Sequence, residues 1–122
     1  MTSPVVTVTE TTTPVTVTIA GRTVASTEAA WRLEEKGLAD RWYLPRSAVD
    51  WTLFSSTDTS THCPRKGDAV YWSFVPSEGG LDSGDRVTDV VWAYPTPLDH
   101  LPELADLVAF YSEKPEVELH VG

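Results

Sequence analysis

The sequence has few cysteines and few basic residues, and each shortage excludes a class of protein. Its 122 residues include one cysteine, Cys63, so it contains neither an internal disulfide framework nor a metal site built on cysteine pairs. A single thiol is also typical of a reducing compartment. Nine Lys and Arg residues against eighteen Asp and Glu give a formal net charge of -9, which disfavours general binding to nucleic acid or to an anionic membrane.

Long hydrophobic runs are also missing. No segment approaches the ~18 to 20 consecutive apolar residues that a membrane-spanning helix needs. The first twenty residues contain no Lys or Arg, so they lack the charged start of a secretory signal. We therefore expect a cytoplasmic protein that makes no contact with a membrane.

Length and composition are those of one globular domain. The chain is 41% hydrophobic and 22% charged, close to average usage, and its length suits a single core. Residues 1–14 are a Thr-rich stretch ending at Pro14, which predicts an extended or disordered tail. Residues 15–122 are predicted to form the domain.

The hydrophobic pattern predicts a mainly β fold, of the α+β class, with antiparallel sheets and two short helices. Alternating apolar and polar residues predict a hairpin over 15–24, with its turn at Gly21, and an edge strand over 41–46 that ends at a proline. A helix of about three turns is expected from the Ser26–Thr27 cap to Gly37, and a shorter one at Pro102. Further strands are predicted over 49–53, 70–74, 87–94, 107–111 and 117–121, with an extended surface segment over 94–97.

The turn from Cys63 to Gly67 contains the first candidates for chemistry. Arg65 and Lys66 favour the thiolate of Cys63, which makes the cysteine a candidate nucleophile; the alternative is a small hydrophobe at the start of a strand. Backbone amides and cations of the same turn could hold a phosphate, and the alternative is a solvated basic turn.

Aromatic residues of two neighbouring strands form the second candidate site. Tyr71 shares a strand face with Ala69, and Trp92 shares one with Tyr94, so two aromatic faces could meet in one concave surface. Such a surface suits a flat ring through stacking. The alternative is that these rings fill a well-packed core.

Several motifs give the sequence a resemblance to a known family. They are Thr61-His62-Cys63-Pro64-Arg65-Lys66-Gly67-Asp68-Ala69-Val70-Tyr71-Trp72, Trp42-Tyr43-Leu44-Pro45-Arg46, Trp92-Ala93-Tyr94-Pro95 and Ala109-Phe110-Tyr111. From about Val15 onwards the chain resembles the bacterial and fungal domain of unknown function numbered four-two-seven, which is also labelled as a nucleotidyltransferase family. The resemblance implies a β-tent-like arrangement of antiparallel sheets, and it implies that Lys66 and Glu35 occupy family positions, with Lys66 a partner for Glu35 or for a ligand anion.

The chain departs from the family pattern at three carboxylates. It has Ala25-Ser26-Thr27 where the family usually has Ala-Asp-Ser, and Pro45-Arg46-Ser47-Ala48-Val49 where the family usually has Pro-Arg-Glu-Asp-Val. Since magnesium is held through carboxylates and zinc knuckles need cysteine pairs, we expect no metal and no other cofactor.

Together these observations predict a small-ligand-binding domain. Its pocket would lie between the Cys63–Gly67 turn and the aromatic strands and would take a nucleotide or another ring-containing anion, with nucleotidyl transfer implied by the resemblance alone. The alternatives are a non-catalytic aromatic-cage module and a thiol-dependent enzyme. The candidate catalytic residues are Cys63 and Lys66, and the candidate ligand-binding residues are Glu35, Tyr43, Arg46, Tyr71, Trp92 and Tyr94.

Overall fold

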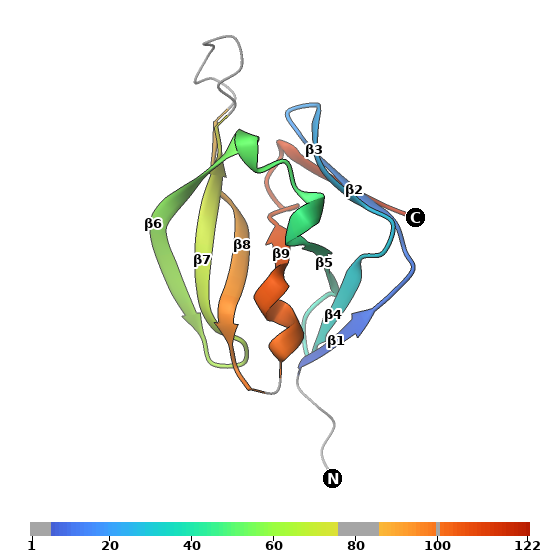
Figure 1. Ribbon diagram of the computed structural model, residues 1–122, viewed down its shortest axis with the longest axis vertical. Coiled ribbons are helices and arrows are strands. Elements are labelled where there is room, and N and C mark those ends of the chain that lie inside the picture. The colour runs from blue at the N-terminus through green and yellow to red at the C-terminus, as the bar shows by residue number, and fades with distance from the viewer. Residues whose placement is uncertain (1–5, 76–85, 100) are drawn as a thin grey trace.

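A computed structural model describes residues 6–75, 86–99 and 101–122, and its strands form two antiparallel sheets (Figure 1). The larger sheet has seven strands in the order β1 (Val6–Glu10), β4 (Trp31–Glu35), β5 (Arg41–Pro45), β9 (Leu107–Phe110), β8 (Val87–Pro97), β7 (Gly67–Phe74) and β6 (Phe54–Cys63). The smaller sheet has the order β10 (Val117–Val121), β2 (Val15–Ile19) and β3 (Arg22–Thr27). The predicted mainly β, antiparallel fold is confirmed.

Alternation along the strands of the larger sheet sends side chains into two separate cores. On β5 and β8, Leu44 and Val91 belong to the core shared with β2 and β3, whereas Tyr43 and Trp92 belong to the other. This second core also holds Leu104 of the 3-10 helix η5 (Pro102–Asp106). Figure 1 shows β6, β7 and β8 on one side of the molecule and β4 and β1 on the other, with η5 between them.

Several predicted elements are confirmed. The first hairpin is β2 and β3, and both turn residues, Ala20 and Gly21, have positive φ. β7 and β8 pair as predicted, and residues 76–85, which lie between them in the chain and were predicted to form a loop, are outside the described residues. The strands predicted over 107–111 and 117–121 are β9 and β10. Within the predicted N-terminal tail, residues 6–10 form β1, which pairs with β4.

The helix predicted up to Gly37 is wrong. The segment forms the end of β3 and the whole of β4, in which Leu33 and Glu35 are buried while Arg32 and Glu34 are exposed. This is the two-residue period of a strand, and pairing with β1 and β5 on its two sides outweighs the local cap and stop signals.

Two further local predictions concern short segments. The short helix predicted at Pro102 is confirmed and is the 3-10 helix η5. The strand predicted over 49–53 is wrong: its last three residues form the 3-10 turn η2 (Trp51–Leu53), which follows η1 (Arg46–Ala48), and Val49 makes only an isolated bridge to Ala25. The Asp50 side chain caps η2 by accepting a hydrogen bond from the Thr52 amide at 3.2 Å, which offers the backbone an alternative to a sheet ladder.

The prolines of β5 and β8 lie in segments that pair with a neighbouring strand on one side only. β5 lies inside the sheet between β4 and β9, so its predicted edge position is wrong, but Pro45 is its last residue. β8 continues to Pro97, whereas the extended segment over 94–97 was predicted to leave the sheet. In that stretch β8 pairs only with β7, because its pairing with β9 ends at Ala93.

Candidate functional site

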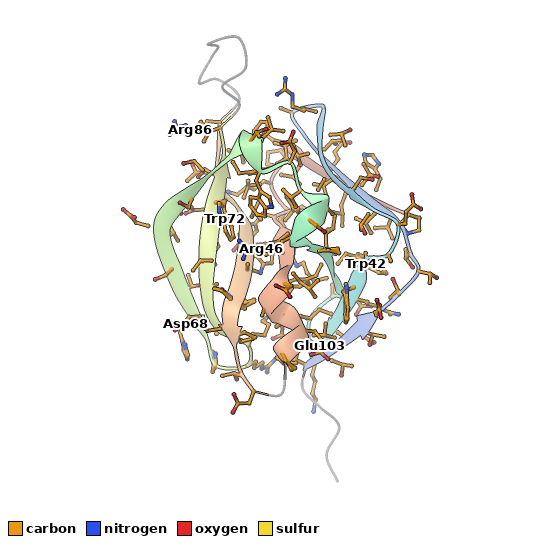
Figure 2. The ribbon with its side chains drawn as sticks, in the orientation of Figure 1. Trp42, Arg46, Asp68, Trp72, Arg86 and Glu103 are labelled. Atoms are coloured by element: carbon orange, nitrogen blue, oxygen red, sulfur yellow. The ribbon has the colours of Figure 1, made fainter. Side chains whose placement is uncertain are left out.

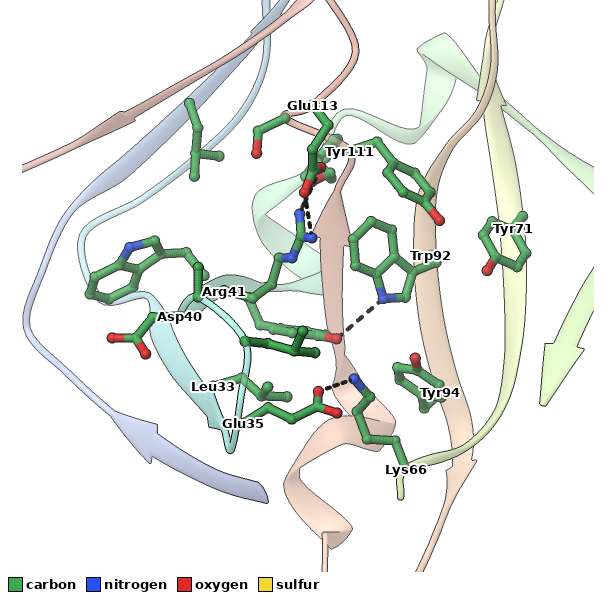
Figure 3. A pocket seen from close by; sticks show the side chains of 17 residues that line it. Leu33, Glu35, Asp40, Arg41, Lys66, Tyr71, Trp92, Tyr94, Tyr111 and Glu113 are labelled. Atoms are coloured by element: carbon green, nitrogen blue, oxygen red, sulfur yellow. Dashed lines mark hydrogen bonds and ion pairs between the residues drawn. The ribbon is translucent and has the colours of Figure 1, made fainter. Parts of the chain in front are cut away.

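A cavity of about 450 Å³ lies on the face of the larger sheet that carries the second core (Figure 3). Strands β4, β5, β7 and β8 each contribute side chains to it, and Lys66 joins from the turn between β6 and β7. Six of the eight candidate residues from the sequence line this one cavity: Glu35, Tyr43, Lys66, Tyr71, Trp92 and Tyr94.

The strand register brings the aromatic residues together. Tyr71 of β7 lies directly opposite Trp92 of β8, and Tyr94 follows two residues later on the same side. Tyr71, Trp92 and Tyr94 are 8%, 8% and 6% exposed, so the rings are mostly enclosed but still reach the cavity. The side chains predicted to form a shared aromatic surface therefore do lie around one hollow.

Tyr43 and Trp92 form the innermost polar contact of the cavity wall. The Trp92 Nε1–H donates a hydrogen bond to the Tyr43 hydroxyl at 3.2 Å, and the two rings meet edge to face at 6.4 Å. Burial raises the pKa of Tyr43 above its usual value, so its hydroxyl keeps its proton and can donate as well as accept.

Tyr111 packs against the Trp92 ring. It follows β9, and its ring centroid lies 4.5 Å from that of Trp92. Burial, together with the nearby Tyr71 hydroxyl, raises the pKa of Tyr111 above its usual value. The Tyr71 hydroxyl is in turn 2.9 Å from Thr61 Oγ1, so one hydrogen bond links Tyr71 to β6.

Glu35 and Lys66 form a buried ion pair at one end of the cavity. Lys66 Nζ donates to Glu35 Oε1 at 2.7 Å, and Arg65 donates to the other carboxylate oxygen at 3.0 Å. The side chains of Glu35 and Lys66 are 7% and 13% exposed. Burial alone would raise the pKa of the Glu35 carboxyl, but the two cations more than offset this and hold it below its usual value.

Arg41 and Glu113 form a second ion pair at the other end (Figure 3). The guanidinium donates to both carboxylate oxygens, at 3.1 and 2.7 Å, and lies 4.9 Å from the centroid of the Trp92 ring. The hydrogen bonds from Arg41 lower the pKa of Glu113, against the opposing effect of burial. Arg41 therefore covers part of the Trp92 ring and is held in place by a carboxylate.

The hydroxyl of Tyr94 makes no hydrogen bond to any described residue. Its ring lies 5.7 Å from Lys66 Nζ, measured to the ring centroid, and burial raises its pKa above the usual value. Within the described ranges every buried side-chain oxygen or nitrogen has a hydrogen-bond partner. Since no hydrogen bond joins the Tyr94 hydroxyl to those residues, the hydroxyl must reach open space, and Tyr94 lines the cavity.

Arg46 and Cys63 are not among the residues that line the cavity. Arg46 lies beside Trp72, which packs against the other core, with its guanidinium 5.4 Å from the centroid of that ring (Figure 2). Cys63 is half-buried against the second core. The turn that contains Cys63 thus presents Lys66 to the cavity rather than its thiol.

The lining residues that the sequence did not predict include Arg41, Tyr111 and Glu113. Tyr111 stands in the Ala-Phe-Tyr motif and Arg41 directly precedes Trp42-Tyr43, so both had a local signal. Glu113 lies in a Glu-Lys-Pro turn with no such signal, because its place depends on Arg41, 72 residues earlier in the chain.

The described residues include no group of three or more His, Cys, Asp or Glu side chains placed to hold a metal ion. Among the same residues, no helix is long and apolar enough to cross a membrane.

Comparison with known proteins identifies the family. A comparison with curated proteins found no match. A family model described as a domain of unknown function, DUF427, matches residues 7–121 and bears the label NTP_transf_9, which suggests a nucleotidyltransferase. Because this match covers nearly the whole chain, the protein belongs to the DUF427 family.

Proposed function

We propose that this domain binds a small molecule with a flat ring in the cavity between β4, β5, β7 and β8, and that it does so in the cytoplasm. The observation that carries the proposal is the convergence of aromatic side chains on that one cavity, among them Tyr43, Tyr71, Trp92, Tyr94 and Tyr111.

The size of the cavity supports this proposal. A volume of about 450 Å³ lies within the range of ~300 to 1,000 Å³ that is common for small-molecule sites, and it can enclose one or two fused rings. Aromatic walls favour flat ligands because each stacked ring contributes ~1 to 3 kcal/mol. An aliphatic molecule of the same volume would forgo this contribution.

The polar groups along the wall support a ligand with hydrogen-bonding edges. The Tyr43 and Tyr94 phenols are protonated at neutral pH, and each can donate to an acceptor on a ring or on its substituent. Apolar surface with a few convergent polar groups is the usual composition of a specific ligand site.

The test is a fragment screen by NMR saturation transfer, with flat heteroaromatic rings and aliphatic molecules of equal heavy-atom count. We expect binding to be concentrated among the flat rings. The absence of any ring that binds, or equal binding of the aliphatic set, would contradict the proposal.

A matched pair of variants locates the binding. Tyr111→Leu removes one ring from the cavity wall, and Phe54→Leu removes one from the other core, where Phe54 contacts Phe74 and Phe110. Loss of one stacking contact should weaken ring binding roughly tenfold in Tyr111→Leu, which corresponds to about 1.4 kcal/mol. Phe54→Leu should leave the affinity within about twofold.

The family label favours nucleotidyl transfer as a second candidate. Lys66 is the cation that a nucleotide phosphate in the cavity would meet, since it shares the Glu35 carboxylate with Arg65, whereas Arg41 is bound to both oxygens of Glu113. Under this hypothesis a nucleoside triphosphate with Mg²⁺ raises the melting temperature, and Lys66→Ala abolishes the increase. A triphosphate that leaves the melting temperature unchanged would favour simple ring binding.

A further inference from the structure

The two cations that line the cavity differ in how much of their charge is neutralised. Arg41 does not share its carboxylate partner with another described cation. Glu113 accepts hydrogen bonds from two of the Arg41 N–H groups, and the Phe110 carbonyl accepts a third hydrogen bond at 3.4 Å. Its charge is balanced one to one, and its planar donor group is largely used. An anionic ligand would have to displace Glu113 to bind there.

Lys66 is in the opposite situation, because it shares its carboxylate with another cation. Glu35 accepts from Lys66 through one oxygen and from Arg65 through the other. Two positive groups and one negative group leave a local excess of one positive charge. Arg65 is not among the cavity-lining residues, whereas Lys66 and Glu35 are, so the excess is presented to the cavity through the ammonium of Lys66.

The other acidic residue of the lining does not cancel this excess. Asp40 is bound by Arg32, with its Oδ2 2.8 Å from Nε. Arg32 also lies 4.0 Å from Glu34 Oε2, so this cation is shared by two carboxylates and leaves no positive excess beside Asp40. The end of the cavity at Lys66 is the one place in the described lining where a positive charge exceeds its partners.

The ammonium of Lys66 also has donors to spare. It carries three N–H groups, and the described residues accept one of them, through Glu35. Tyr94 stands next to it, with its hydroxyl free of any partner among those residues (Figure 3). A carboxylate, with two oxygens and several lone pairs, matches two neighbouring donors of this kind.

We infer that the ring ligand carries a single carboxylate, which accepts hydrogen bonds from Lys66 Nζ and the Tyr94 hydroxyl while the ring lies against Trp92 and Tyr111. The inference rests on the proposed function, since it names the class of molecule that the same cavity takes. The single excess positive charge at Lys66 matches the single negative charge of a carboxylate. A triphosphate would bring several negative charges to the same site.

The test uses acids paired with their primary amides: benzoate with benzamide, and indole-3-acetate with indole-3-acetamide. Each pair keeps the ring and the shape of the substituent, while the amide replaces one charged acceptor oxygen by a neutral NH2 group. Titrations followed by NMR should give the acid at least tenfold tighter binding than its amide. Equal binding of acid and amide would overturn the carboxylate inference and leave ring binding standing, whereas no binding of either would count against ring binding itself.

Two variants that remove a lysine charge separate a local effect from a general one. Lys66→Met should reduce the preference for the acid to less than about twofold while the amide still binds. Lys36→Met removes the same charge from an exposed neighbour of Glu35 and should keep the full preference. A preference that survives Lys66→Met would overturn the inference.

The variant Glu35→Gln distinguishes ligand binding from a purely structural role for the Glu35, Lys66 and Arg65 ion pairs. The substitution removes the competing carboxylate and keeps an oxygen as acceptor, so the local excess rises from one positive charge to two. The acid should then bind several-fold more tightly than to the unchanged protein, and the amide should not. Weaker acid binding by a Glu35→Gln protein whose near-ultraviolet circular dichroism is unaltered would contradict the inference.

Discussion

Tyr43 and Trp92 are joined by a hydrogen bond across an intervening strand. They stand on β5 and β8, which are separated in the sheet by β9, yet Trp92 Nε1 lies 3.2 Å from the Tyr43 hydroxyl. Ala109 of β9 lies opposite Trp92 and is fully buried beneath the contact. A small residue between two large ones lets the side chains meet above it, and this contact forms the floor of the cavity.

This contact predicts a clear difference between two phenol deletions. Tyr43→Phe leaves the buried indole N–H of Trp92 without a partner, so it should lower the free energy of unfolding by ~1 to 3 kcal/mol. Tyr94→Phe removes a hydroxyl that no described residue engages, and should change the free energy by less than ~0.5 kcal/mol. Urea denaturation measures both. Equal losses would mean that the Tyr94 hydroxyl has a structural partner.

The Glu35 ion pair predicts a pH dependence of stability. The pKa of Glu35 in the folded protein lies below its ordinary value of 4.5, so the ionised carboxylate stabilises the fold at every pH above that value. As the pH falls below about 4.5 and through the lowered pKa, this contribution is lost. The difference in free energy of unfolding between the unchanged protein and Glu35→Gln should therefore shrink with acidification.

Glu34→Gln provides the control for that experiment, because Glu34 is the exposed neighbour of Glu35 on the other face of β4. Its effect on the free energy of unfolding should be small at every pH. A Glu35→Gln effect that stays constant from pH 7 to pH 3 would show that the ion pair does not stabilise the fold.

Gly67 is predicted to be the least replaceable of the described glycines. Its φ is +122°, and a Cβ there would lie 3.1 Å from the Thr96 carbonyl oxygen and 3.2 Å from the Pro97 Cα, both in the backbone of β8. Gly67→Ala should therefore lower the stability of the fold more than Gly37→Ala, because Gly37 has a φ of +86° but open space around it. Thermal denaturation compares the two. A smaller decrease in stability for Gly67→Ala than for Gly37→Ala would show that the backbone of β8 shifts easily to make room beside Gly67.

The position of Cys63 predicts that ring binding does not need its thiol. Since Cys63 is not among the cavity-lining residues, Cys63→Ser should bind flat rings with an affinity within about twofold of the unchanged protein. Titration with the tightest ring from the screen measures this. A complete loss of binding by a folded Cys63→Ser protein would favour the thiol-dependent enzyme instead.

The sequence predicted most strands because their hydrophobic residues alternate over several positions. The prediction failed at β4. Ser26, Glu28 and Gly37 are typical of the ends of a helix, but pairing of β4 with two other strands stabilises a strand there instead. The prediction failed at η2 because the Asp50 side chain competes for the backbone amides. Local patterns are reliable where the fold does not contradict them.

The candidate site shows the same division between local and distant information. Tyr71, Trp92 and Tyr94 could be placed on one surface from strand periodicity, since they lie on neighbouring strands of a hairpin. Arg46 was predicted to bind the ligand in the pocket, but the turn η1 places it beside Trp51 and Trp72 instead. Glu113 could not be found, because the chain reaches Arg41 only through the order of the sheet.

The central claim, that a flat ring binds against Trp92, is tested most directly by the indole N–H signals in a two-dimensional ¹H–¹⁵N spectrum during titration with indole-3-acetate. The Trp92 Nε1–H points at Tyr43 in the cavity wall, whereas the Trp51 Nε1–H donates to the Arg46 carbonyl at 2.8 Å, beside the other core. We predict that the Trp92 signal shifts to saturation while the Trp51 signal stays in place. A saturating shift of Trp51 with an unmoved Trp92 would contradict the account.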